Sequence, residues 1–252
     1  MATAGSEGQG FPVRLGFLCS SGSDVSSDVS PEFRDRLVER HDVRLALYLP
    51  PGHALAMGQP AEKRRRATYA DLEAVPPGKV AELIDGQLYV FPRPAPPHLN
   101  AEGALTDLLR GPFHRGYGGP GGWWILPEPE VHFPEPAEPG GVQVVDPDLA
   151  GWRRERMPEL PKTAYFPLPP DWLCEVLSPS TEDHDRNTKM PLYAHNGVRW
   201  AWLIDPLART LEVYVLGEGR RWKEPTVYRG EARVRAVPFD SIELRLADLW
   251  TQ

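Results

Sequence analysis

The sequence has few cysteines and no long hydrophobic run. Cys19 and Cys174 are its two cysteines among 252 residues, and two isolated thiols provide neither a disulfide framework nor a zinc site. No segment approaches the roughly 20 apolar residues of a membrane-spanning helix. The apolar stretch FPVRLGFLCSSG is short, contains Arg14, and follows a segment without Lys or Arg, so we do not interpret it as a signal peptide. These absences favour a cytoplasmic protein that has no membrane segment.

Basic residues are scarce relative to acidic ones. The sequence contains 28 Lys and Arg against 35 Asp and Glu, for a formal net charge of −7. A protein that coats nucleic acid needs a broad basic surface, and this balance argues against one. Contacts with phosphates would therefore depend on local basic clusters, which lie at residues 63–66, 153–156 and 220–223.

Proline and glycine, by contrast, are abundant. The 29 prolines and 23 glycines predict many loops, whereas a hydrophobic content of 41% is sufficient for a core. Residues 1–27 are rich in Gly and Ser, and we expect them to be disordered. We predict a folded domain over residues 57–252, preceded by an extension over residues 1–56 that is disordered or lies upstream of a natural start at Met57.

From Thr68 onward, the sequence alternates between helical and strand-like patterns. Thr68 is a plausible cap for a short helix, and Asp85–Gly86 predicts the turn of a hairpin. The predicted order is helix, two strands, helix, three strands, helix, two strands, which indicates an α/β domain with a mixed central sheet flanked by helices. The segments concerned are TYADLEAV, VAELIDGQLYVF, PHLNAEGALTDLLRGPF, WWILPEPEVHF, GVQVVDPDLAGW, DWLCEVLS, STEDHDRNTKMPLYAHNG and RWAWLIDPLARTLEVYVL.

A carboxylate lies within the apolar strand segment DWLCEVLS. Glu175 has apolar residues on both sides, and a buried charge is costly unless it is paired. Asp148 ends the preceding strand segment VVDPDL, and Lys189 lies on the helix that follows Glu175. Adjacent strands would bring both carboxylates to one edge of the sheet, where they could bind Mg²⁺ or Mn²⁺. Lys189 would then orient the attacking water and stabilise the charge that develops on a phosphodiester.

Each of these residues also has a simpler interpretation. Glu175 could be a buried acid paired with an arginine such as Arg186, and Asp148 could be an ordinary turn residue after proline. Lys189 could be solvated on an amphipathic helix. The basic segment GWRRERMP, which follows Asp148, could contact phosphates or pair with its neighbouring acids.

The segments PDLAGWRRERMPELP and DWLCEVLSPSTEDHDRNTKMPLYAHNGVRWAWLIDPLARTLEVYVL closely resemble the Uma family of restriction endonucleases. These proteins are bacterial members of the PD-(D/E)XK nuclease superfamily. The resemblance extends back through YADLEAVPPGKVAELIDGQLYVF and forward to VPFDSIELRLADLW, and it covers residues 57–250. It implies a restriction-endonuclease-like core and the cleavage of DNA, and it suggests a homodimer.

The resemblance assigns the site residue by residue. Asp148 and Glu175 take the positions of the two metal-binding carboxylates. The superfamily's usual lysine position, two residues after the acid, is Leu177, and Lys189 on the next helix takes that role instead. Five further residues at matching positions are candidate supporting residues: Glu82, His98, Glu130, Asp185 and Tyr193. Asp146 departs from the family pattern and would be an extra surface acid or an alternative ligand.

We therefore expect a metal-dependent DNA endonuclease that uses Mg²⁺ or Mn²⁺ and a site of two carboxylates and a lysine. The displaced lysine keeps open a catalytically inactive nuclease-fold protein that binds nucleic acid or a protein partner. Hydrolysis of another phosphate ester or nucleotide is a second alternative. Ser178 does not lie in a G-x-S-x-G motif, and no Gly-rich phosphate loop occurs, which argues against a serine hydrolase and a P-loop enzyme.

Overall fold

The computed structural model describes residues 65–134 and 141–250. The predicted extension over residues 1–56 lies outside the described residues, as does the beginning of the predicted domain. Its boundary at residue 57 therefore stays a prediction. Among the described helices, none combines the length and the apolar character needed to cross a membrane.

A short helix and a hairpin begin the described chain, as predicted. α2 (Tyr69–Glu73) follows Thr68. β1 (Lys79–Ile84) and β2 (Gln87–Pro92) pair antiparallel around Asp85–Gly86. Both turn residues have positive φ angles, 51° and 70°, which is the geometry that a two-residue hairpin turn of this type requires.

Two segments that we expected to form one strand each form two strands in different sheets. WWILPEPEVHF contains β3 (Trp123–Pro127) and β4 (Val131–Pro134), and GVQVVDPDLAGW contains β5 (Val142–Val145) and β6 (Leu149–Arg153). The prediction of three strands between the two long helical segments was therefore wrong, because five are found. Proline lies at each break, in PEP and in DPD, and proline cannot donate a ladder hydrogen bond.

The strands form two main sheets. A four-stranded antiparallel sheet has the order β2-β1-β5-β4, and a six-stranded sheet has the order β10-β9-β8-β7-β6-β3. The larger sheet is mixed, because β7 (Trp172–Val176) and β8 (Trp200–Asp205) run parallel whereas its other neighbouring pairs are antiparallel. The remaining strands are β9 (Thr210–Val215), β10 (Thr226–Arg229), β11 (Arg233–Val234) and β12 (Leu244–Arg245).

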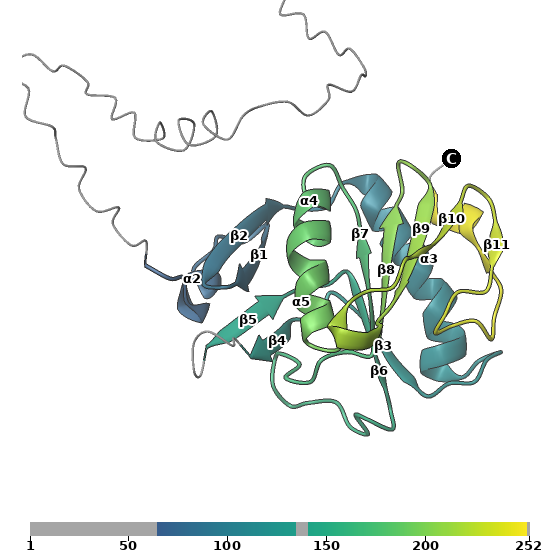
Figure 1. Cartoon of the computed structure of the whole chain (residues 1–252), viewed down its shortest axis with the longest axis horizontal. Coiled ribbons are helices and arrows are strands. Elements are labelled where there is room, and N and C mark those ends of the chain that lie inside the picture. The colour runs from purple at the N-terminus through teal and green to yellow at the C-terminus, as the bar shows by residue number, and fades with distance from the viewer. Residues whose placement is uncertain (1–64, 135–140, 251–252) are drawn as a thin grey trace, which may run out of the picture. The chain divides into compact units, whose positions relative to one another are not determined.

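Helices cover both faces of the larger sheet (Figure 1). α3 (Pro96–Leu109) packs on one face, and a continuous helical run packs on the other. This run comprises α4 (Glu182–His184), the π-helical segment η2 (Asp185–Lys189) and α5 (Met190–His195). The expected α/β domain with a mixed central sheet flanked by helices is confirmed. The other helical segments are η1 (Arg110–Arg115), η3 (Glu218–Arg220) and η4 (Leu246–Leu249).

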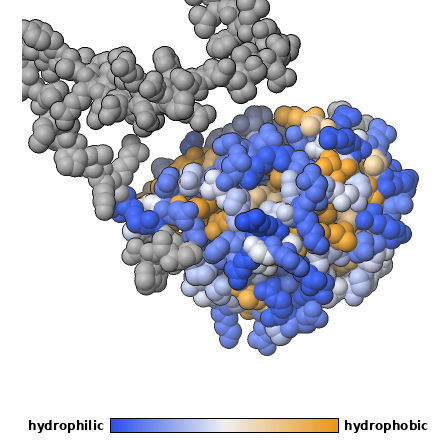
Figure 2. Space-filling view, in the orientation of Figure 1, coloured by the Kyte–Doolittle hydropathy of each residue, from blue (hydrophilic) through white to orange (hydrophobic). Residues whose placement is uncertain are grey.

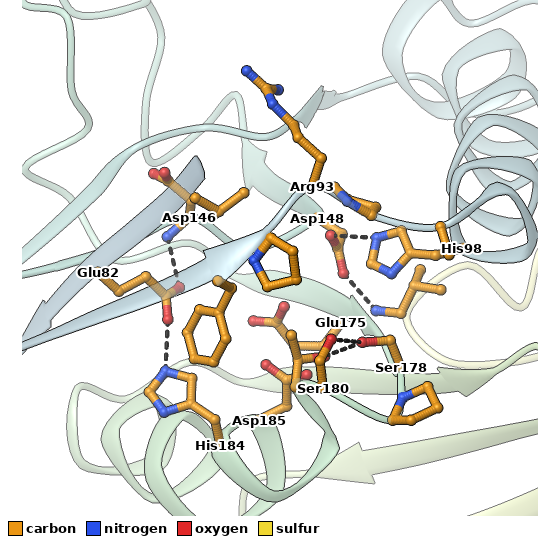
Figure 3. Close-up of a pocket in the computed structure, with 18 of the residues that line it drawn as sticks. Glu82, Arg93, His98, Asp146, Asp148, Glu175, Ser178, Ser180, His184 and Asp185 are labelled. Carbon is orange, nitrogen blue, oxygen red and sulfur yellow. Dashed lines mark hydrogen bonds and ion pairs between the residues drawn. The ribbon is translucent and has the colours of Figure 1, made fainter. Parts of the chain in front are cut away.

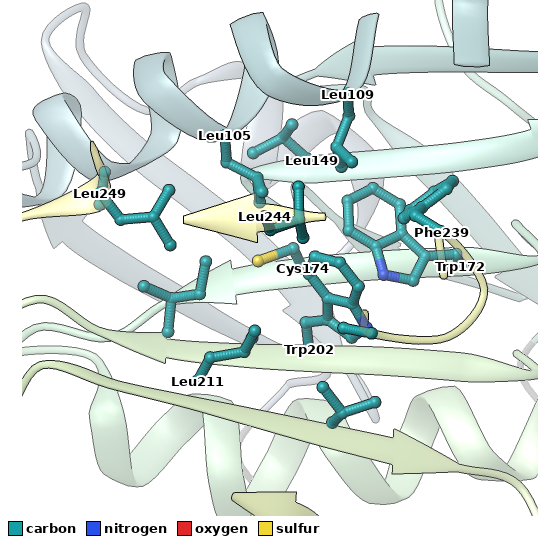
Figure 4. Packing of buried hydrophobic residues seen from close by; sticks show 14 of the residues in the cluster. Leu105, Leu109, Leu149, Trp172, Cys174, Trp202, Leu211, Phe239, Leu244 and Leu249 are labelled. Carbon is teal, nitrogen blue, oxygen red and sulfur yellow. The ribbon is translucent and has the colours of Figure 1, made fainter. Parts of the chain in front are cut away.

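The alternation of side chains along β7 divides the core into two apolar clusters. Trp172, Cys174 and Val176 belong to the cluster beneath α3, which Figure 4 shows. Leu173 and Leu177 belong to the cluster beneath α5. All five are at most 2% exposed, and each large apolar side chain buried in this way stabilises the fold by about 1.5–3 kcal/mol.

The face of the domain seen in Figure 2 is mainly hydrophilic, with hydrophobic residues in separate small areas. Such scattered apolar residues are common on monomers and do not define an interface. The expected homodimer therefore stays a prediction. The large apolar residues that are exposed come from several parts of the described chain: Val90, Leu99, Tyr117, Leu160, Leu207 and Val227.

Candidate functional site

The register of β6 and β7 brings the two predicted metal-binding acids to one edge of the larger sheet. Leu149, the first residue of β6, pairs with Cys174, so Asp148 lies beside the C-terminal end of β7. The main-chain N–H of Val176 donates to Asp148 Oδ2 at 2.6 Å. Asp148 and Glu175 both line one cavity of about 270 Å³ (Figure 3).

Glu175 is a buried carboxylate on the face of β7 that packs against the helical run. It is 2% exposed. Its Oε1 accepts a hydrogen bond from the Tyr193 hydroxyl and lies 2.9 Å from Lys189 Nζ. The alternative partner, Arg186, instead forms two hydrogen bonds with Glu212, at 2.9 and 2.7 Å. The alternative in which Glu175 pairs with Arg186 was therefore wrong, because Glu175 pairs with Lys189.

Lys189 reaches the cavity from the π-helical segment η2. Leu177, two residues after Glu175, is 2% exposed and packs in the apolar cluster beneath α5. Lys189 is 4% exposed, and its Nζ lies 2.9 Å from Oε1 of both Glu82 and Glu175. A third carboxylate, that of Asp185, is 3.5 Å away. The helix thus places an ammonium on the same face of the sheet as Leu177, and π-helical segments are frequent at functional sites.

Burial and neighbouring charges shift the pKa of each member of this cluster. Burial alone would lower the pKa of Lys189, but Glu175 and Glu82 raise it well above its ordinary value, so the ammonium stays protonated. Burial raises the pKa of Glu175 well above the ordinary value for a Glu. Lys189 only partly offsets that effect, because the carboxylates of Asp185 and Asp148 raise this pKa further. Burial likewise raises the pKa of Asp185.

Glu82 connects the β1–β2 hairpin to the helical run. It is 2% exposed, unlike most acids in hairpins. Its Oε1 accepts the main-chain N–H of Asp146 at 3.1 Å, and its Oε2 lies 2.7 Å from His184 Nε2. Burial would raise the pKa of Glu82, but Lys189 and His184 together hold it below its ordinary value. Glu82 is therefore a charged anchor that fixes Lys189.

Asp146 adds another carboxylate to the wall of the cavity. From the sequence, Asp146 was expected to be either an extra surface acid or an alternative metal ligand. It is half-buried, and its Oδ1 has no hydrogen-bond partner among the described residues. Burial, followed by the nearby charges of Glu82 and Glu130, raises the pKa of Asp146 to about 7. A fully solvated surface position is therefore excluded.

His98 lies at the cavity, whereas Glu130 does not. His98, in the first turn of α3, places Nε2 2.8 Å from Asp148 Oδ1. Glu130 is absent from the residues that line the cavity. It accepts hydrogen bonds from the Tyr69 hydroxyl at 2.9 Å and from His132 Nε2 at 2.6 Å. Glu130 therefore ties α2 to β4, and of the predicted supporting residues it has the least connection to the cavity.

Glu102 was not predicted, although it lies close to Asp148. One carboxylate oxygen of Glu102, a ring nitrogen of His98 and a carboxylate oxygen of Asp148 all lie within 4.8 Å of one another. Glu102 follows His98 by four residues on a segment predicted to be helical, and this spacing puts two side chains on the same helix face. The spacing was therefore the signal that could have identified it.

The composition of the cavity wall fits a divalent cation. The buried ammonium of Lys189 faces several carboxylates, and Asp146 Oδ1 has no hydrogen-bond partner among the described residues. Burial, together with the neighbouring carboxylates, raises the pKa of Glu175. Carboxylate oxygens are the ligands that Mg²⁺ prefers. Five carboxylates line the cavity: Glu82, Asp146, Asp148, Glu175 and Asp185.

The arginines of GWRRERMP lie at the opposite end of β6 from Asp148. The guanidinium groups of Arg153 and Arg154 stack on tryptophan rings, and Arg156 lies 2.7 Å from Asp171. Asp148 precedes β6, whereas these arginines end or follow it, so contact between them and phosphates stays a prediction. Their aromatic and acidic partners lie around the end of β6 that is opposite Asp148.

Comparison with known proteins gives a family and a fold. The model of the Uma2 family, described as "Putative restriction endonuclease", matches residues 66–247. A similar solved structure is "a putative nuclease belonging to DUF820" from Anabaena variabilis, with 22% identity and a TM-score of 0.57. The match covers 72% of this chain and 96% of that chain, and at this identity it shows the fold alone. Curated proteins offer no match.

Proposed function

The chain belongs to the Uma2 family, and on this premise we propose that it is a metal-dependent endonuclease that hydrolyses phosphodiester bonds of DNA. The observation that carries the proposal is the meeting of two carboxylates, Asp148 and Glu175, with the buried ammonium of Lys189 at one cavity. The stability of the fold does not require such a cluster, because apolar residues of similar volume often stabilise a core as well as a buried ion pair does.

Asp148 and Glu175 are the proposed ligands of Mg²⁺ or Mn²⁺. When bound, such a cation lowers the pKa of a water molecule and neutralises negative charge on the phosphodiester. Asp148 is held in place by the main-chain N–H of Val176 and by His98. Glu175 is oriented by the hydroxyl of Tyr193.

Lys189 acts in this proposal as a hydrogen-bond donor and as a fixed positive charge. Its raised pKa keeps the ammonium protonated, so Lys189 cannot accept a proton from water as a general base. It would orient the attacking water and stabilise the negative charge that develops on the phosphate oxygens. Glu82 and Asp185 hold the ammonium in position.

DNA would approach the open side of the cavity. Arg93 is exposed and lines this cavity, as do the hydroxyl-bearing residues Ser178 and Ser180. Arginine and serine side chains commonly contact phosphate oxygens. Because the net charge is −7, the affinity for DNA would depend on these local contacts and on the cation.

A catalytically inactive nuclease-fold protein that binds nucleic acid or a protein partner is the alternative. The apolar Leu177 in the usual lysine position favours it, together with the engagement of Lys189 by three carboxylates. In that case the charged cluster would have no catalytic role, and the protein would bind nucleic acid or a protein partner without cleaving DNA.

Cleavage of plasmid DNA by the purified full chain separates the two functions. We expect the wild type to nick or linearise plasmid with Mg²⁺ or Mn²⁺ and to be inactive with EDTA. Glu175→Gln should reduce the rate at least 100-fold, whereas Glu224→Gln, which removes the same charge at an exposed position, should retain it. Equal cleavage by the wild type and Glu175→Gln would refute the site, and no cleavage by any form would favour the inactive alternative.

A further inference from the structure

We propose that His98, Glu102 and Asp148 bind a divalent transition-metal ion of the Mn²⁺, Co²⁺ and Zn²⁺ class, beside the cation assigned to Asp148 and Glu175. His98 and Glu102 lie on α3, and Asp148 immediately precedes β6. One donor atom from each lies within 4.8 Å of the other two. Ligands on rigid elements are held in position before the ion arrives.

The separations are compatible with coordination of a single ion. His98 Nε2 and Asp148 Oδ1 lie 2.8 Å apart, close to the spacing of adjacent ligands that are each about 2.1 Å from one metal ion. His98 and Glu102 are four residues apart on one helix, and side chains at this spacing lie on the same face. Two ligands at i and i+4 form the helical part of many protein metal sites.

One of the three proposed ligands, Glu102, lacks the partner that a buried carboxylate normally has. The Glu102 side chain accepts no hydrogen bond and forms no ion pair within residues 65–134 and 141–250, although the residue is only 9% exposed. His98 is 6% exposed, and its Nε2 faces Asp148. Unpaired buried polar groups are costly. A cation bound between Glu102 and His98 would compensate the carboxylate and give the imidazole a ligand role.

The imidazole distinguishes this site from an all-oxygen magnesium site. Mg²⁺ prefers six oxygen ligands, several of them water. An imidazole nitrogen with two carboxylates suits Mn²⁺, Co²⁺ or Zn²⁺ better, and affinity for such ligands rises along that part of the first transition series. A large excess of Mg²⁺ should therefore fail to displace Co²⁺ from His98, Glu102 and Asp148.

The inference deepens the proposed function, because Asp148 would contribute to both cation sites. It is nevertheless a statement about binding and does not depend on cleavage. Glu175 faces the helical run on the other side of β7 and pairs with Lys189, whereas Glu102 is absent from the residues that line the cavity. Substitutions at Glu175 and Glu102 can therefore separate the two sites.

The test is a Co²⁺ titration of the metal-stripped full chain in a large excess of Mg²⁺, followed by visible absorption. We expect saturable binding of one Co²⁺ by the wild type. Glu102→Gln and His98→Asn should each weaken the affinity at least tenfold. Asp107→Asn removes a charge from an exposed position of the same helix and should leave the affinity unchanged. Circular dichroism verifies that each variant is folded, and the two ligand variants test the cluster independently.

Several outcomes would overturn the inference. These are the absence of saturable Co²⁺ binding by the wild type, displacement of Co²⁺ by Mg²⁺, and an unchanged affinity in the folded Glu102→Gln or His98→Asn variant. The Glu175→Gln variant should still bind Co²⁺. A protein that binds Co²⁺ in a Glu102-dependent manner but never cleaves DNA would support this inference while refuting the proposed nuclease function.

Discussion

Replacing Lys189 with methionine tests how much the buried ammonium contributes to the stability of the fold. The substitution retains the apolar stem and removes an ammonium that lies 2.9, 2.9 and 3.5 Å from three carboxylates. Breaking a buried ion pair by removing one partner typically costs about 3–5 kcal/mol. We expect the free energy of unfolding of Lys189→Met to fall by about this amount at pH 8.

The loss should diminish as the pH falls. The pKa values of Glu175 and Asp185 are already raised in the folded wild type, and removal of the ammonium raises them further. A carboxyl with a higher pKa in the folded state than in the unfolded chain binds its proton first in the folded state, so the folded variant gains relative stability as the pH decreases. The gap between wild type and variant should therefore narrow between pH 8 and pH 5.

Urea unfolding of both proteins at pH 8 and pH 5, with EDTA present, measures this gap. Lys162→Met is the matched control, because Lys162 is exposed and its loss should change stability by no more than about 0.5 kcal/mol. A loss below about 1 kcal/mol for Lys189→Met at pH 8 would refute the reasoning. So would a gap of the same size at both pH values.

Two further substitutions test other parts of the cluster. Tyr193→Phe removes the hydroxyl that donates to Glu175 and should lower the free energy of unfolding by about 1.5–3 kcal/mol. Urea unfolding measures this loss, and an unchanged midpoint would contradict the role of the hydrogen bond. Asp146→Asn should stabilise the protein at pH 8 but not at pH 4, because the pKa of Asp146 is raised from 3.8 to about 7 in the folded state. At about 1.36 kcal/mol per pKa unit the gain is at most about 4 kcal/mol, and a gain independent of pH would contradict the assignment.

Local features of the fold could be predicted from the sequence because neighbouring residues decide them. Asp85–Gly86 can adopt the positive φ angles of a hairpin turn at low cost, and Gly197, with φ of 78°, ends the helical run where it was expected to end. The division of WWILPEPEVHF and GVQVVDPDLAGW into strands of two sheets could not be predicted as readily. Each half is stabilised by a partner strand that is distant in the sequence.

The candidate site follows the same division. Glu175 stood out because a carboxylate is unusual in an apolar strand segment. Asp148 and Lys189 were selected because of their places on the neighbouring strand and helix and because they match a family pattern. The partners of these residues depend on tertiary contacts, because Glu82 lies on the four-stranded sheet and Tyr193 lies on α5. Glu102, which lies close to Asp148, was not predicted. Arg186, a plausible neighbour of Glu175 in the sequence, points to Glu212 instead.

The sequence alone determined the class of the domain, its hairpin and helices, and the presence of an acid in a strand that would otherwise be apolar. These properties follow from periodicity and from the conformational limits of single residues. The tertiary structure decided which charges share a cavity, because the β6–β7 register places Asp148 beside Val176 and the π-helical turn places Lys189 between Glu82 and Glu175. Pairing of distant segments depends on packing across the whole domain, which no local pattern encodes.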